Sequence, residues 1–143
     1  MPAPLSDLAE MLATLDVVVR PDLFVFAAVP AGSPAASAAD AVITEEEAVT
    51  LVLREGRARE HGLATGTRFA WLTLTVHSSL ESVGLTAAVA GALAASGISC
   101  NVLAGFHHDH LLVPERDRAR AVDVLRALRH SGSNPRGLDP GGS

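Results

Sequence analysis

The chain has 143 residues, of which 48% are hydrophobic, and a formal net charge of -5. That length suffices for one ordinary domain or for two small ones of about 60 to 70 residues each. The negative balance, without a basic surface cluster, argues against a nucleic-acid partner, and no apolar run reaches the roughly 18 residues that a membrane span requires. The single cysteine cannot form an internal disulfide, and the start Met1-Pro2-Ala3-Pro4 lacks the basic and apolar regions of a secretory signal. We therefore expect a cytoplasmic protein without a membrane partner.

The first half of the chain predicts a small α+β unit from leucines at helical spacing, valine- and phenylalanine-rich runs and a small-residue segment. In chain order, the expected elements are a helix over 5–15, strands over 16–20 and 23–29 joined by a turn at Pro21-Asp22, a mobile loop over 31–39, strands over 42–43 and 49–53, and a helical turn over 54–62. The glutamates 45–47 could form a cation site or a solvated loop, and the loop is the commoner use of such a charge run.

The second half begins near Thr67 and predicts the order strand, helix, strand, strand, helix. Trp71, Thr73, Thr75 and His77 alternate with apolar residues along the first strand, so they share one face. The remaining expected elements are a helix over 85–93, a strand from Ile98 with Cys100 as a core filler, a strand over 110–113, a helix from Pro114 to about His130, and a disordered tail from Ser131.

This order is typical of an α+β ferredoxin-like βαββα(β) sandwich, in which an antiparallel sheet carries both helices on one face. The last strand is absent from the second half. We therefore expect the first half to supply it, so that the two halves form an interlocked pair. The other face of the sheet is expected to stay free for a partner.

Two patterns in the second half carry a resemblance to a known family. A helix that opens with Gly84-Leu85 and ends in Gly97-Ile98 before a strand resembles the ACT domain over Phe69 to Arg129. More narrowly, segments of both halves resemble bacterial proteins made of two fused ACT-like units; the segments are 5–15, 24–26, 46–52, 76–81, 84–87, 100–102 and 108–110. The resemblance implies an amino-acid-binding regulatory protein with ACT-like units over 1–66 and 67–131 and a tail over 132–143.

The candidate ligand-binding residues gather at the expected end of the first strand of the second half. Thr75 and Asn101 fall on the open sheet face, where the resemblance implies that ACT units pair and effectors bind, and His77 matches a histidine that contacts the effector in some ACT domains. The other candidates surround the start of the helix and the following hairpin: Ser78, Ser79, Glu81, Val83 (where many ACT domains have proline), Gly84, Leu85, His108 and Asp109.

The chemistry of these residues suits an amino acid. The free backbone N–H groups of the helix's first turn favour a carboxylate, and Gly84 would let it approach closely. Glu81 suits an ammonium group. Ser78 and Glu81 also have capping-box spacing, so they could simply close the helix end, and His77 could be a surface imidazole hydrogen-bonded within its loop.

Two other site classes are weaker. His107, His108, His110 and Asp109 invite a metal site, but adjacent His107 and His108 would point to opposite faces of a strand, and Asp109 reads more simply as a turn residue. Ser78 or Ser79 beside His77 could mimic a nucleophile and base, but neighbours in sequence rarely aim at each other. We therefore expect no metal, no cofactor and no enzyme activity.

Our leading hypothesis is a regulatory protein that binds an amino-acid-like small molecule at an interface between ACT units or subunits. We expect a homodimer, because a half-polar sheet face favours self-complementary pairing. The alternative is a protein-protein interaction module that uses the open sheet face without a ligand.

Overall fold

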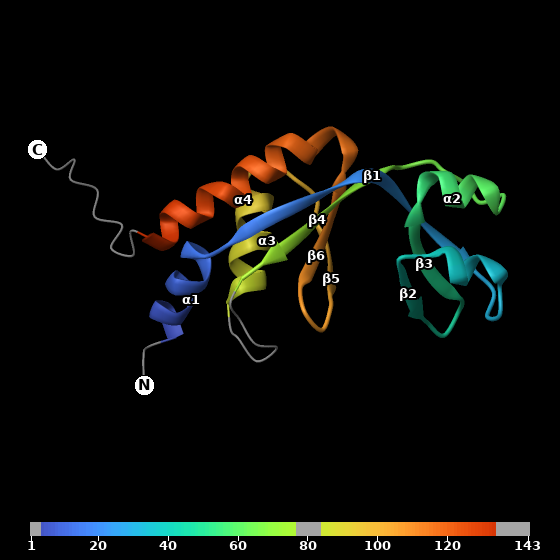
Figure 1. Ribbon diagram of the computed structural model, residues 1–143, viewed down its shortest axis with the longest axis horizontal. Helices are drawn as coiled ribbons and strands as arrows, with labels where there is room; N and C mark the ends of the chain where they lie inside the picture. The colour runs from blue at the N-terminus through green and yellow to red at the C-terminus, as the bar shows by residue number, and fades with distance from the viewer. Residues whose placement is uncertain (1–3, 77–83, 134–143) are drawn as a thin grey trace, which may run out of the picture.

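The computed structural model describes residues 4–76 and 84–133. They form one six-stranded antiparallel sheet with the strand order β2-β3-β1-β4-β6-β5 (Figure 1). The strands are β1 (Asp16–Val29), β2 (Ala41–Thr44), β3 (Val49–Arg54), β4 (Phe69–Thr75), β5 (Asn101–Ala104) and β6 (Asp109–Pro114). The helices are α1 (Pro4–Ala13), α2 (Glu55–Glu60), α3 (Leu85–Ala95) and α4 (Arg118–Ser133), with 3-10 helices η1 (Pro34–Ala38) and η2 (Glu115–Asp117).

Strands β1 and β4 are shared by two ferredoxin-like units. In the first unit the sheet order β2-β3-β1-β4 has η1 and α2 as its two crossover helices. In the second unit the order β1-β4-β6-β5 has α3 and α4. Each unit thus takes its fourth strand from the other, which explains how the missing strand of the second half is supplied. The expected interlocking of the halves is therefore seen directly in the sheet.

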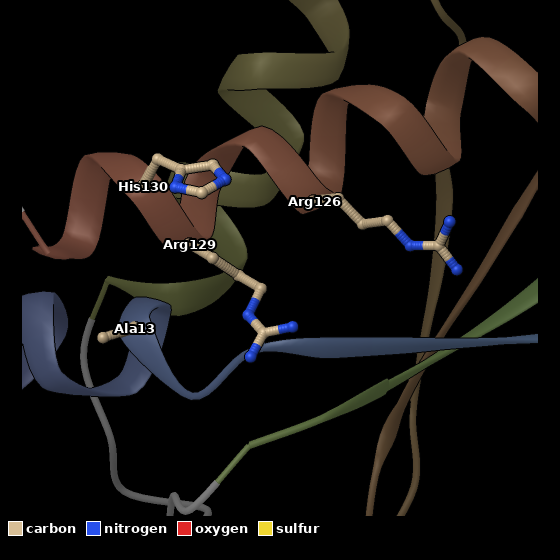
Figure 2. A pocket seen from close by; sticks show the side chains of 4 residues that line it. All are labelled: Ala13, Arg126, Arg129 and His130. Atoms are coloured by element: carbon tan, nitrogen blue, oxygen red, sulfur yellow. The ribbon is translucent and has the colours of Figure 1, made fainter.

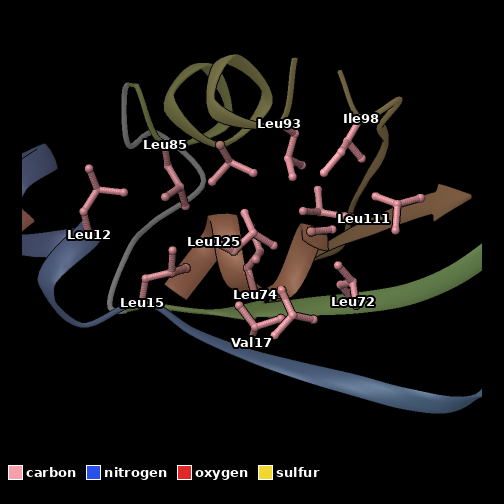
Figure 3. Packing of buried hydrophobic residues seen from close by; sticks show 14 of the residues in the cluster. Leu12, Leu15, Val17, Leu72, Leu74, Leu85, Leu93, Ile98, Leu111 and Leu125 are labelled. Atoms are coloured by element: carbon pink, nitrogen blue, oxygen red, sulfur yellow. The ribbon is translucent and has the colours of Figure 1, made fainter. Parts of the chain in front are cut away.

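The helix-covered face of the sheet holds two apolar cores. The larger one joins β4, β6, α3 and α4 to α1 and the first half of β1, and includes Leu15, Leu72, Leu93, Leu111 and Leu125 (Figure 3). The smaller core joins β1, β3, η1 and α2. Phe24 of β1 pairs with Arg54 of β3 and with Phe69 of β4, so these three side chains share one face of the sheet. The adjacent residues Leu53 and Ala70, which belong to the smaller and the larger core, therefore lie together on the other face, so both cores are on the same side of the sheet.

A third apolar cluster lies on the face away from the helices and crosses both units. Its buried members are Phe24, Val52, Trp71 and Leu112, contributed by β1, β3, β4 and β6. The rings of Phe24 and Trp71 lie 4.9 Å apart between centroids, a separation typical of favourable aromatic pairs. The face expected to be free is thus partly occupied by aromatic packing at the junction of the units.

The first half departs from the sequence-based expectation in two places. The runs 16–20 and 23–29 are not two strands joined by a turn: β1 is continuous, with a register shift between Val19 and Leu23. Proline lacks a backbone donor, so Pro21 interrupts the ladder locally without ending the strand. Segment 31–39, expected to be a mobile loop, contains η1, capped by Ser33, with Ala35 and Ala38 buried.

The second half shows smaller differences. Helix α4 continues through Ser133, beyond its expected end, and is preceded by η2. Ala104 and Phe106 were expected on the apolar face of the strand from Ile98, but Ala104 is exposed and Phe106 is 80% exposed, because β5 ends at Ala104. Ile98, Cys100 and Val102 do pack against the main core as expected, and burial raises the pKa of the Cys100 thiol.

Candidate functional site at the junction of the two units

The predicted ligand-binding residues are only partly within the described chain. His77, Ser78, Ser79, Glu81 and Val83 lie outside the described residues. The capping-box alternative for Ser78 and Glu81 does not apply to α3, because the residue at its N-cap is Gly84.

Thr75 and Asn101 both lie on the open sheet face but not beside each other. Asn101 pairs with Leu112, which in turn pairs with Trp71, so Asn101 lies level with Trp71, four residues before Thr75 on β4. At about 3.3 Å per residue this separates the two by roughly 13 Å along the strands. The Asn101 side chain instead bonds Leu112 O at 3.5 Å, and Thr75 Oγ1 donates to Asp16 O at 3.4 Å.

Gly84 and Leu85 lie on the helix side of the sheet. Leu85 is 5% exposed within the main core, so its side chain makes core contacts. Gly84 has φ +97°, and a Cβ there would lie 3.2 Å from Leu8 Cδ2, which shows that α1 packs against this glycine. The close approach that we expected for a ligand is thus made by Leu8. The helix start and the open face are not parts of a single recess among the described residues.

The β5–β6 turn lies at the same end of the sheet as the end of β4, as expected, because Leu74 pairs with Asp109. Asp109 itself is the first residue of β6, not a turn residue; the turn is closed by Gly105 N–H donating to His108 O at 2.9 Å. No group of three His, Cys, Asp or Glu residues within 4–76 and 84–133 is arranged to hold a metal ion.

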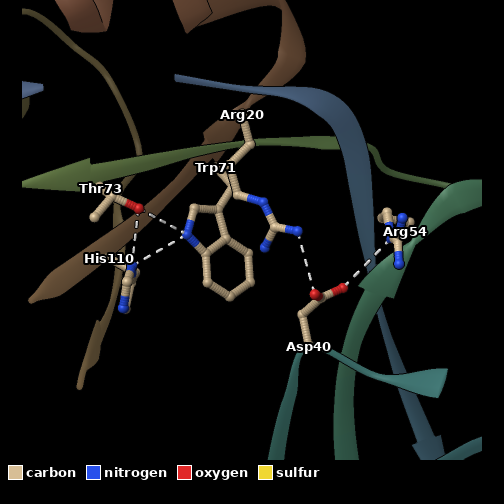
Figure 4. A network of polar contacts seen from close by, with 6 residues as sticks. All are labelled: Arg20, Asp40, Arg54, Trp71, Thr73 and His110. Atoms are coloured by element: carbon tan, nitrogen blue, oxygen red, sulfur yellow. Dashed lines mark hydrogen bonds and ion pairs between the residues drawn. The ribbon is translucent and has the colours of Figure 1, made fainter. Parts of the chain in front are cut away.

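The open face brings together Trp71, Thr73 and His110 at the middle of the sheet (Figure 4). The indole N–H of Trp71 is 3.2 Å from both Thr73 Oγ1 and His110 Nδ1, and these two atoms are 3.0 Å apart. The indole N–H of Trp71 donates to Nδ1 when the neutral imidazole carries its proton on Nε2, whereas in the other tautomer Nδ1 donates to Thr73 Oγ1. Burial, followed by the neighbouring His108, lowers the pKa of His110.

Arg20 connects this group to the first unit. Its guanidinium carbon lies 4.7 Å from the centroid of the Phe24 ring and 4.9 Å from that of Trp71. Its Nη2 donates to Asp40 Oδ1 at 3.2 Å, and Asp40 Oδ2 lies 3.8 Å from Arg54 Nε. A polar junction of six residues therefore crosses both units: Arg20, Asp40, Arg54, Trp71, Thr73 and His110 (Figure 4).

Alternation along the strand predicts Thr73 on this face, but it does not predict the charged members of the junction. The available signal was Arg20-Pro21-Asp22 within a run of apolar strand residues, which we interpreted as a turn. Because β1 continues through Arg20, the charged side chain has to point away from the apolar cores. It lies instead over two aromatic rings on the opposite face of the sheet. Asp40 and Arg54 meet Arg20 only through sheet pairing, which has no local sequence signal.

A recess of about 390 Å³ lies on the helix side and contains none of the predicted residues. It is lined by Ala13 of α1 and by Arg126, Arg129 and His130 of α4 (Figure 2). The two arginine side chains extend in different directions and do not converge on one point (Figure 2). We therefore consider the polar junction, whose side chains do converge, the better candidate site.

Comparison with known families matches both halves of the chain. Residues 67–127 match one model of the ACT domain and residues 3–70 match another. The chain belongs to the ACT-domain family. ACT domains are regulatory rather than catalytic units, and the two matches agree with the two ferredoxin-like units that share β1 and β4. No curated protein matches the chain in sequence. No helix within the described residues of this ACT protein is long and apolar enough to cross a membrane.

Solved structures give relatives at two levels of similarity. A Vibrio cholerae protein of unknown function, described as a possible transport protein, is 37% identical with a TM-score of 0.81, over 89% of this chain and 99% of its own. A Clostridium acetobutylicum aspartate kinase, described as an allosteric enzyme, is 10% identical with a TM-score of 0.58, over 80% of this chain and 34% of its own. E. coli aspartokinase III in complex with aspartate and ADP is 15% identical with a TM-score of 0.54, over 80% of this chain and 32% of its own. These kinases share the fold over a third of their length.

Proposed function

We propose that this ACT protein is a regulatory sensor that binds an amino-acid-like small molecule at an interface between ACT units or subunits. The observation that carries the proposal is the polar junction, because it places charged and hydrogen-bonding groups where two ACT units meet (Figure 4). Neither Arg20 nor Asp40 is fully buried: their side chains are 30% and 22% exposed. They are accessible to a small solute from the face away from the helices.

Binding of a ligand at this junction would affect both units. Ligand contacts to β1 or β4 act on strands that belong to both units, so binding stabilises the relative position of the units. The coupling typical of allosteric proteins, about 1 to 3 kcal/mol, suffices to shift an assembly equilibrium or a partner's affinity. The remaining candidates stay predictions for further contacts, which a second subunit would complete in a homodimer; they are His77, Ser78, Ser79, Glu81, Val83, His108 and Asp109.

A thermal-shift screen of the twenty amino acids tests this function, followed by isothermal titration calorimetry of each one that stabilises the protein. A ligand present at about 100 times its Kd stabilises the folded state by about 2.7 kcal/mol, which gives an easily measured rise in Tm. We expect a small, chemically related group of amino acids to bind. If none of them stabilises the protein at millimolar concentration, the proposed function is wrong.

Exposed apolar side chains favour one alternative, a protein-protein interaction module. Phe106 is 80% exposed at the β5–β6 turn, and Val18 and Val42 are 52% and 50% exposed on β1 and β2. Phe106→Ser separates the two functions, because Phe106 is exposed and lies outside the polar junction. In a sensor this change leaves the response to an amino acid at the wild-type level, whereas in an interaction module it weakens capture of the partner in pull-down while the protein stays folded.

A further inference from the structure

The charges of the polar junction do not balance. Arg20 and Arg54 supply two guanidinium groups, and Asp40 supplies the one carboxylate that lies within 4.0 Å of them among the described residues. The nearby Glu55 is engaged by Arg59 at 2.5 Å and by Arg68 at 3.8 Å. The three junction residues therefore carry one net positive charge in a chain whose overall formal charge is -5. A local cationic centre of this kind favours one further anionic group.

Within 4–76 and 84–133, the two arginines use few of their N–H donors for hydrogen bonds to other residues. A guanidinium has five N–H donors in a planar fork. Arg20 donates to Asp40 Oδ1, while Arg54 Nε lies 3.8 Å from Asp40 Oδ2, too far for a hydrogen bond. Within the described residues, Asp40 Oδ2 thus has an ion-pair neighbour but no hydrogen bond.

The position of Arg20 is fixed by its surroundings. Its guanidinium lies over Phe24 and Trp71, which are 0% and 5% exposed, and the indole of Trp71 is held by Thr73 and His110. A planar cation stacked on an immobile ring loses little conformational freedom when its edge binds an acid. All 11 positively charged residues of the chain are arginines, so this fixation, rather than residue type, distinguishes Arg20 from the others.

We infer that Arg20 and Arg54 bind the carboxylate of an α-amino acid and that Asp40 Oδ2 accepts a hydrogen bond from its ammonium group. The inference rests on the proposed function and specifies its recognition chemistry. An arginine pair with one aspartate complements a zwitterion, because each charged end of the ligand meets the opposite charge. Ligand binding would also tie β1, β3 and the residue before β2 to one molecule, and Arg20 in turn lies over Trp71 of β4.

The test uses full-length protein and calorimetric titration with each of the twenty L-amino acids. Every amino acid that binds is compared with its methyl ester, which lacks the carboxylate charge, and with its N-acetyl derivative, which lacks the ammonium. We expect each derivative to bind about tenfold or more weakly than the parent. Arg54→Gln should weaken binding of the parent about tenfold and remove most of its preference over the methyl ester.

Arg57→Gln is a matched control, because the side chains of Arg54 and Arg57 are both 46% exposed and both form an ion pair, but Arg57 pairs with Glu60 on α2. This control should bind as wild type does. Arg20→Gln should resemble Arg54→Gln, and if it fails to fold, the half-exposed Arg54 carries the test. If an amino acid binds but Arg54→Gln keeps wild-type affinity and ester discrimination, this inference is wrong while the proposed function stands. If no amino acid binds wild type, both fail.

Discussion

Replacing Leu51 by alanine should destabilise both ACT units together, although this side chain packs in the core of the first unit alone. Leu51 is 0% exposed, and truncating such a buried leucine costs about 2 to 5 kcal/mol. Because β1 and β4 belong to both units, loss of the first unit removes β3, the strand that pairs with β1 at the edge of the second unit. With a urea m-value of about 1 to 3 kcal/mol per molar, the transition midpoint should fall by roughly 0.7 to 5 M.

Two optical signals distinguish joint from separate unfolding. The helical circular dichroism reports chiefly on the second unit, since α1, α3 and α4 pack there, and the fluorescence of Trp71 reports on the junction. We expect both signals to shift to the same lower midpoint in the Leu51→Ala variant, as in a two-state transition. Val42→Ala, at a site 50% exposed, should change the stability by less than about 1 kcal/mol. A helical midpoint that stays at the wild-type value in Leu51→Ala would refute the shared-strand reasoning.

Three further predictions follow from individual contacts. Gly84→Ala should lower the free energy of unfolding by about 1 to 2 kcal/mol, because φ is +97° and the new Cβ would meet Leu8 at 3.2 Å; Gly91→Ala, within α3 and with nothing within 4 Å, should instead stabilise by up to about 1 kcal/mol in the same urea titrations. The lowered pKa of His110 means that the unfolded chain, with a histidine pKa of about 6.5, takes up the proton first as the pH falls. The contribution of the neutral imidazole is thus complete above about pH 6.5 and declines below it, and His110→Asn should flatten the stability difference between pH 7 and pH 5; an unchanged slope would contradict the lowered pKa of His110. Phe106→Ser should leave the stability within about 0.5 kcal/mol, since its side chain is 80% exposed, but should weaken self-association in analytical ultracentrifugation if the β5–β6 turn lies in a dimer interface.

The periodicity of the sequence predicted most of the regular structure. Alternation at Leu72 and Leu74 and helical spacing at Leu85, Val89 and Leu93 both reflect contact with a single core, and the structure buries all five. Because the second half lacks a last strand, we predicted that the first half supplies one, and β1 does so. The continuity of β1 through Pro21 could not be predicted, because it depends on pairing with β3 on one side and β4 on the other.

The candidate site was harder to predict than the fold. Local patterns drew attention to the residues around Gly84, where α1 packs against the glycine instead, a contact between segments far apart in the chain. The residues that do converge come from β1, the position before β2, β3, β4 and β6, and none is adjacent to another in sequence. Pair contacts of this kind depend on strand order and register, which a single sequence does not reveal.

Because each unit takes a strand from the other, the two halves of the chain are not expected to fold as separate fragments. A fragment ending after Gly66 keeps β1 but lacks β4, and the complementary fragment keeps β4 but lacks both β1 and α1. Each piece should be unstable by itself, because β1 in one fragment and β4 in the other would lack the strand with which they pair. Co-expressed, the two pieces should reassemble and restore the native emission of Trp71, so that the protein would behave as a split reporter. Separate, stably folded halves would show that each unit can form without the strand that the other supplies.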